Sequence, residues 1–176
     1  DLVGDKAFTD TKVPFAVVAA DLVKGEKVIL SQGKLFDALL ASASIPGMFP
    51  PVILDNKILV DGGIVDVVPI ETAKSLGANF VIGVNVSQTI KKRVEFDNAV
   101  EIFFRSDSIT SSELRKLQLS FADVLITPKV RRFHWSDFSK PEQCIREGEI
   151  AAQDAISELK QKLKRIQPKW WRKLFY

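Results

Sequence analysis

The stretch that most constrains the fold of this chain runs from Ala41 to Pro69 and centres on Asp61, Gly62 and Gly63. Two apolar triplets flank a short polar segment before these residues, which predicts a tight β-hairpin whose second strand ends at Asp61. An acidic residue at the end of a strand projects beyond the sheet. The two glycines permit a positive φ and a close approach of other backbone, which suits a carboxylate held in a crowded pocket.

Asp61 also allows a simpler interpretation, in which its side chain caps a turn beside a Gly-Gly bend. Just after this bend, Pro69 predicts the first turn of a helix over residues 70–76, and Gly77 predicts its end. The residues alone leave both interpretations of Asp61 open.

The rest of the chain alternates between predicted strands and helices, which indicates an α/β fold with right-handed crossovers. The apolar runs at 14–22 and 80–86 are typical of strands buried on both faces in a parallel sheet. A capping box over 139–142 predicts the start of a long amphipathic helix. The remaining strands are predicted at 27–30 and 123–130, and the other helices at 33–40 and at 97–119, the latter as two helices or one bent helix.

The segment from Ile45 to Pro51 is apolar but contains three prolines, so it is neither a continuous helix nor a central strand. Such a loop beside the Asp61 strand suits the wall of an acyl-chain pocket, and it suits a buried connection equally well. The candidate pocket residues are Ile45, Pro46, Met48 and Phe49.

Three polar side chains near these elements are weaker candidates. Ser42 and Ser44 lack the flanking glycines of a nucleophile elbow, so we expect neither to be a nucleophile. Asp21 ends the first predicted strand, and we expect it to form a turn rather than to line a site.

Composition indicates one globular domain, because 46% of the 176 residues are apolar and 27% are charged. No apolar run reaches the ~18 residues of a membrane span, and the first residues lack the apolar core of a signal peptide. The single cysteine, Cys144, and the single histidine, His134, offer no disulfide, metal-ligand set or catalytic triad. We therefore expect no metal or cofactor. We also expect a cytoplasmic protein, with a peripheral location at the membrane as the open alternative.

The charge is unevenly distributed along the chain. Residues 160–176 carry seven Lys or Arg and no acid, which leaves 18 basic against 22 acidic residues, a net −4, on the rest. The last residues mix aromatic rings with cations, as segments at a membrane interface do, although the rings would also suit packing on the domain. The candidate membrane-contact residues are Trp170, Trp171, Arg172 and Lys173.

Three segments of the sequence resemble the C-terminal half of the patatin-like phospholipases. They are ASASIPGMFPPV, LVDGGIVDVVPI and AKSLGANFVIGVNVS. The similarity is to the branch that includes bacterial patatin-like esterases and neuropathy target esterase. This resemblance implies a three-layer α/β/α fold with a mainly parallel sheet and a Ser–Asp dyad in which Asp61 is the aspartate. The family's GxSxG nucleophile elbow and its glycine-rich oxyanion loop do not occur among the nine glycines of this sequence.

The resemblance implies that residues 1–168 are the C-terminal portion of a patatin-like catalytic domain and that residues 169–176 are a basic aromatic tail. The expected function is acyl-ester hydrolysis of a phospholipid or lysophospholipid, with the serine on the missing N-terminal half of the domain or on a second chain. We expect the isolated chain to be inactive. The alternative is a non-catalytic patatin-like lipid-surface or interaction protein, and nothing indicates a nucleic-acid partner or a nucleotide site.

Overall fold

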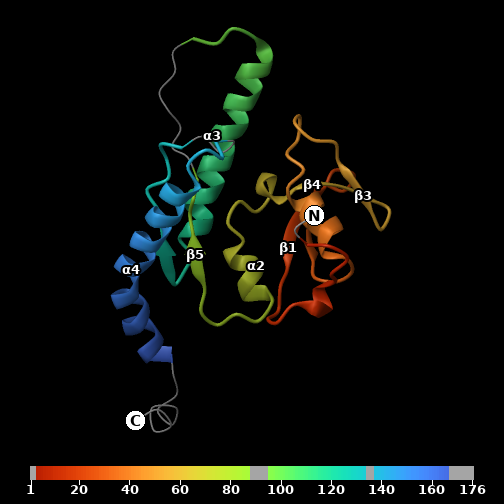
Figure 1. The fold of residues 1–176 in the computed structure, drawn as a ribbon. Coiled ribbons are helices and arrows are strands. Elements are labelled where there is room, and N and C mark those ends of the chain that lie inside the picture. Colours follow the sequence, from red (N-terminus) through yellow and green to blue (C-terminus); the bar gives the residue numbers. More distant parts are fainter. Residues whose placement is uncertain (1–2, 88–94, 134–136, 167–176) are drawn as a thin grey trace. The chain divides into compact units, whose positions relative to one another are not determined.

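The computed structural model describes residues 3–87, 95–133 and 137–166. They form a mixed α/β structure of two compact units, which Figure 1 traces along the chain. The first unit comprises residues 1–69 with 113–115, and the second comprises residues 70–112 with 116–176. A four-stranded sheet lies in the first unit and a two-stranded sheet in the second.

All neighbours in the four-stranded sheet are antiparallel, and the strand order is β2-β1-β4-β3. The prediction of a mainly parallel sheet is therefore wrong for this unit. Tight turns join β1 to β2 and β3 to β4, and strands joined by such turns are antiparallel. An apolar run indicates that a strand is buried but not in which direction its neighbours run. The strands are β1 (Val17–Asp21), β2 (Glu26–Leu30), β3 (Val52–Leu54) and β4 (Lys57–Asp61).

The hairpin that leads into Asp61 has the predicted form. Leu54 pairs with Lys57, so the turn consists of Asp55 and Asn56 alone. Both residues have positive φ, 50° and 58°, as a two-residue type I′ turn requires. The hairpin register is thereby fixed, and β4 ends at Asp61.

One helix covers the four-stranded sheet. This helix, α1 (Leu35–Ser42), lies against β1 and β4. Ala41 packs with Ala19 of β1 and Leu59 of β4, and all three residues are completely buried. The small side chains at Ala19 and Ala41 let the helix and the sheet approach closely. A second cluster joins α1 to the short 3-10 helix η1 (Phe8–Asp10) and contains Phe8, Leu35 and Ala38.

In the second unit, two parallel strands are flanked by helices. The strand β5 (Ile82–Val84) pairs with β6 (Val124–Ile126). The helix α2 (Ile70–Ser75) reaches β5 where the side chain of Ile70 lies beside Gly83, and α4 (Pro141–Ile166) lies against β6. Gly77 follows α2 with a φ of 102°, as predicted for its end.

The segment expected to be two helices or a bent one is a single helix, α3 (Ala99–Leu119). Its serine and threonine residues do not interrupt it, because their hydroxyls bond within the helix. The hydroxyls of Ser108 and Thr110 donate to the carbonyls of Phe104 and Ser106, four residues earlier, at 2.7 and 3.2 Å.

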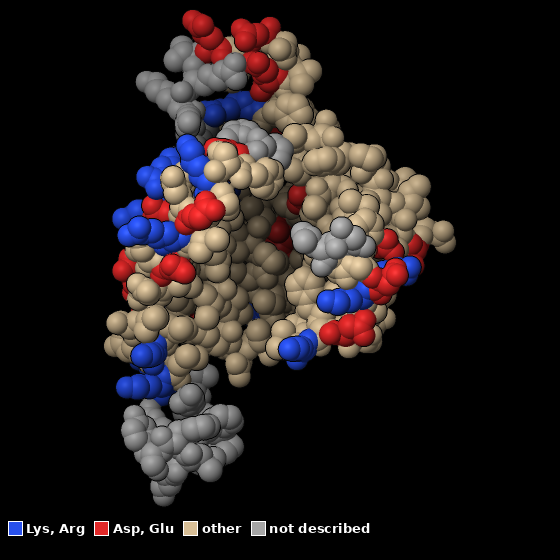
Figure 2. Space-filling view, in the orientation of Figure 1, with Lys and Arg blue, Asp and Glu red and all other residues tan. Residues whose placement is uncertain are grey.

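The long helix α4 was predicted with nearly correct bounds, but its predicted capping box is wrong. In a capping box the backbone N–H of Ser139 would donate to the side chain of Glu142, but it donates to the carboxylate of Asp137 at 3.0 Å, as the hydroxyl of Ser139 does at 2.6 Å. Figure 2 shows acidic and basic side chains mixed along α4. Within the described part of the chain, no helix combines the length and the apolarity that crossing a membrane requires.

Candidate functional site

Asp61 is the last residue of β4 and also the cap of the short 3-10 helix η2 (Gly62–Ile64). Its side chain is half-buried, and its Oδ1 accepts the N–H of Gly63 at 2.7 Å. The backbone N–H of Asp61 donates to the carbonyl of Ser44 at 3.0 Å. Among the described residues no donor reaches Oδ2, so one carboxylate oxygen is fixed and the other is open. Asp61 therefore caps the 3-10 helix as the simpler interpretation predicts, and this bond leaves its Oδ2 without a donor among the described residues.

Gly62 permits a backbone contact that no other residue would allow. A Cβ at this position would lie 2.4 Å from the carbonyl oxygen of Val18 in β1. A Cβ at Gly63 would lie 3.0 Å from Oδ1 of Asp61. Neither glycine has a positive φ, so the expectation based on φ is wrong and the expectation of a close backbone approach is confirmed.

An ion pair with a buried acid holds the far end of the same turn. The N–H of Asp66 donates to the carbonyl of Gly62 at 2.8 Å, and the side chain of Asp66 is only 3% exposed. Its carboxylate contacts the ammonium of Lys27 in β2 at 2.9 Å. The turn after Asp61 is thus tied to β1 by Gly62 and to β2 by Asp66. Sequence reasoning missed Asp66 because its partner lies 39 residues earlier.

Replacing Lys27 with methionine is expected to lower the free energy of unfolding by about 1–3 kcal/mol, because the buried Asp66 would lose its ion pair with Lys27. Urea denaturation measures this change. The double variant that also carries Asp66→Asn should lose less stability than the two single variants lose together, by at least ~0.5 kcal/mol. Fully additive losses would show that the pair contributes nothing as a pair.

The other predicted side chains of this unit have structural partners or lie at the surface. The hydroxyl of Ser42 donates to Val18 and that of the buried Ser44 donates to Leu40, both at 2.7 Å. Asp21 accepts the N–H of Val23 at 2.9 Å, which is the predicted turn role. Of the pocket candidates, Ile45 and Pro46 are half-buried, whereas Met48 and Phe49 are 49% and 52% exposed. Their role as pocket walls stays a prediction.

Some predicted residues lie outside the described part of the chain. They are His134 and the membrane-contact candidates Trp170, Trp171, Arg172 and Lys173. Across residues 3–87, 95–133 and 137–166, no group of three or more His, Cys, Asp or Glu side chains is arranged to hold a metal ion.

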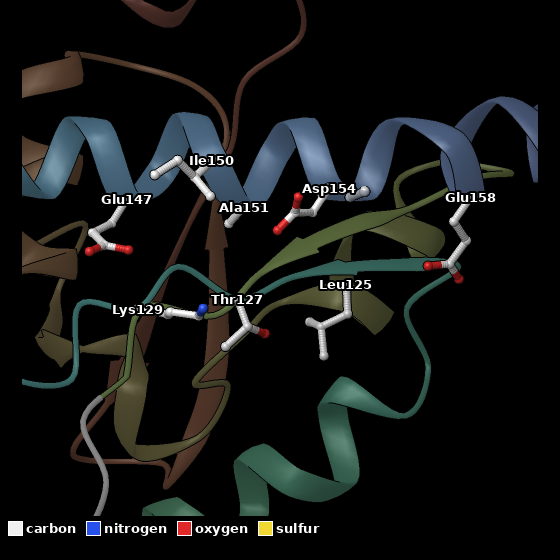
Figure 3. Close-up of a pocket in the computed structure, with 9 residues that line it drawn as sticks. Leu125, Thr127, Lys129, Glu147, Ile150, Ala151, Asp154 and Glu158 are labelled. Atoms are coloured by element: carbon white, nitrogen blue, oxygen red, sulfur yellow. The ribbon is translucent and has the colours of Figure 1, made fainter.

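A charged cavity of about 250 Å³ lies in the second unit, between α4 and the strand β6. Figure 3 shows the carboxylates of Glu147, Asp154 and Glu158 along one side of α4, above Thr127 and Lys129. Glu147 is paired with Arg132 at 3.0 Å, and Glu158 with Lys162 at 2.6 Å. These pairings indicate a compensated helix face rather than an ester-binding site.

A family model described as patatin-like phospholipase matches residues 1–74, which include β4, Asp61 and both glycines. Residues 1–74 of the chain are thus similar to the patatin-like phospholipase family. This establishes the predicted resemblance, and the match covers the whole Asp61 turn with its Asp66 anchor.

Proteins of the NTE family are among those similar to this chain. An uncharacterized NTE family protein of Mycobacterium tuberculosis is 36% identical over 87 residues, which are 49% of this chain and 24% of the relative. Another from the same organism is 26% identical over 166 residues, covering 81% of this chain and 28% of the relative. Patatin-like phospholipase domain-containing protein 7 of Mus musculus is 30% identical over 84 residues, 47% of this chain and 6% of the relative. The chain spans about a quarter of the length of the mycobacterial relatives that it matches.

Proposed function

We propose that this chain supplies the catalytic aspartate of a patatin-like hydrolase that cleaves acyl esters of phospholipids or lysophospholipids. The observation that supports this most is the setting of Asp61, inside the family-matched segment. Gly63 fixes one oxygen of its half-buried carboxylate, and Oδ2 has no hydrogen bond from the described residues. A fixed carboxylate with one open oxygen is what a general base needs.

In the proposed reaction, a serine hydroxyl attacks the ester carbonyl carbon while Oδ2 of Asp61 accepts the hydroxyl proton. The bond from the acyl carbon to the leaving oxygen then breaks, and the proton passes from Asp61 to that oxygen. A water molecule then attacks the acyl carbon while Asp61 accepts its proton, the bond from the acyl carbon to the serine oxygen breaks, and Asp61 returns the proton to that oxygen. Such a dyad requires no histidine.

The nucleophile is assigned to a segment outside these 176 residues, because no pair of glycines in the sequence brackets a serine in the GxSxG pattern. The oxyanion of the tetrahedral intermediate needs backbone N–H donors, which we assign to the same outside segment. That segment is either the other half of the catalytic domain or a second chain.

The isolated chain is expected to show no turnover of a p-nitrophenyl ester above the rate in buffer, because it supplies the base without the nucleophile. A colorimetric assay of purified residues 1–176 measures this, with the longer polypeptide that contains the preceding segment as the positive control. Turnover by residues 1–176 that Asp61→Ala abolishes would place the nucleophile within this chain.

The second candidate function is a non-catalytic patatin-like protein that binds a lipid surface or a protein partner. The exposure of Met48 and Phe49 favours it. This candidate predicts that liposome binding by the full-length protein requires Trp170 and Trp171, and that Asp61→Asn changes no ester turnover.

A further inference from the structure

An apolar cavity of about 640 Å³ lies in the second unit, beyond the carboxyl ends of the two parallel strands. Its described lining comes from the end of β5, from the connection between β6 and α4, and from the first turns of α4. Crevices at the carboxyl ends of parallel strands are frequent ligand sites, and this volume lies within the ~300–1,000 Å³ of small-molecule pockets. Its apolar walls include Val84, Val86, Pro128, Val130 and Phe133.

A glycine in α4 keeps one side of this cavity open. Gly148 lies well inside the helix, where glycine is unfavourable relative to alanine, and it lines the cavity. A Cβ built at Gly148 would meet no atom within 4 Å. Any side chain at this position would therefore project into open space.

The polar content of the lining indicates which kind of ligand fits. Of the eleven described lining residues only Asp137 is charged, and its carboxylate already accepts the N–H and the hydroxyl of Ser139. A peptide segment in this cavity would need partners for its own N–H and C=O groups, and the walls offer few. An aliphatic chain needs none.

We propose that this cavity binds the aliphatic chain of a single-chain amphiphile. The inference does not rest on the proposed hydrolase, because the described lining includes neither Asp61 nor the residues that bond to it. The Asp61→Asn variant should accordingly bind as the unmodified chain does, which separates a failure of this proposal from a failure of the proposed function.

The single cysteine of the chain provides the measurement, because half-buried Cys144 lines the cavity. A bound chain should slow the reaction of this thiol with a colorimetric disulfide reagent. In purified residues 1–176 we expect 1-decanol to protect Cys144 and 1-butanol at the same concentration to leave its rate unchanged. Each buried methylene should tighten binding about fourfold, so half-protection by decanol should need about 15-fold less alcohol than by octanol.

Two variants test the place of binding. Gly148→Leu should raise the decanol concentration for half-protection at least about tenfold. The leucine side chain would occupy part of the cavity, so that several methylene groups of the alcohol could no longer be buried there. Ala152→Leu adds the same side chain at an exposed position of α4 outside the lining and should change nothing. Phe138→Asp, at a lining residue that is 86% exposed, should also weaken protection without threatening the fold.

Protection by decanol that is lost with Gly148→Leu and Phe138→Asp, and kept with Ala152→Leu, would support the proposal. It is overturned if decanol gives the unmodified chain no protection, or if both lining variants are protected as well as the control. A thiol that reacts slowly without alcohol and is insensitive to it would mean that protein fills the cavity, which also overturns the proposal.

Discussion

Replacing Gly62 with alanine is expected to lower the free energy of unfolding by about 3 kcal/mol. The new Cβ would lie 2.4 Å from the carbonyl oxygen of Val18, which is backbone and not the end of a flexible side chain. Val18 belongs to β1, which is held by β2 on one side and β4 on the other, so it cannot move away cheaply. Urea denaturation followed by circular dichroism measures the loss.

Gly148→Ala is the matched control, because it makes the same chemical change where no atom lies within 4 Å. In a helix interior this change should raise the free energy of unfolding by about 0.5–1 kcal/mol. The two substitutions therefore have opposite expected signs. Equal midpoints for Gly62→Ala and the unmodified chain would show that the turn after Asp61 does not approach β1 closely.

The sequence predicted the elements around Asp61 well, because local turn chemistry determines them. Asp55 and Asn56 tolerate the positive φ of a type I′ turn, and Gly77 ends the helix that follows Pro69. These signals act within a few residues, so they can be read without knowing the tertiary structure.

Features that depend on distant residues were not predicted. The two hairpins of the first sheet were predicted, but the mainly parallel sheet was wrong, because the apolar run of β1 indicates its burial and not that it pairs antiparallel with β4. The Lys27–Asp66 pair joins residues 39 apart and left no local pattern. The continuity of α3 was missed for a different, local reason: its hydroxyls suggested breaks in the helix, whereas at least two of them donate to carbonyls one turn earlier.

Replacing Asp61 with asparagine is expected to lower kcat/KM for ester hydrolysis about 10³-fold in the polypeptide that joins this chain to its nucleophile. Asparagine keeps the shape of aspartate, and its carbonyl oxygen can still accept the N–H of Gly63. What it loses is the ability to take up a proton from a hydroxyl. The turn should therefore stay folded while the chemistry fails.

Asp55→Asn is the matched control for this substitution, because it makes the same change six residues earlier. Asp55 lies in the hairpin turn with a φ of 50°, a conformation that asparagine adopts readily. Its variant should keep the activity and stability of the unmodified protein. A loss common to both variants would indicate a general effect of charge or folding.

The decisive measurement is kcat/KM for one ester substrate in Asp61→Asn and Asp55→Asn, with the unfolding midpoint of each variant recorded alongside. Our account predicts a loss of about 10³-fold for Asp61→Asn alone, at an unchanged midpoint. Equal and undiminished hydrolysis by both folded variants would contradict the assignment of Asp61 as the residue that accepts the proton.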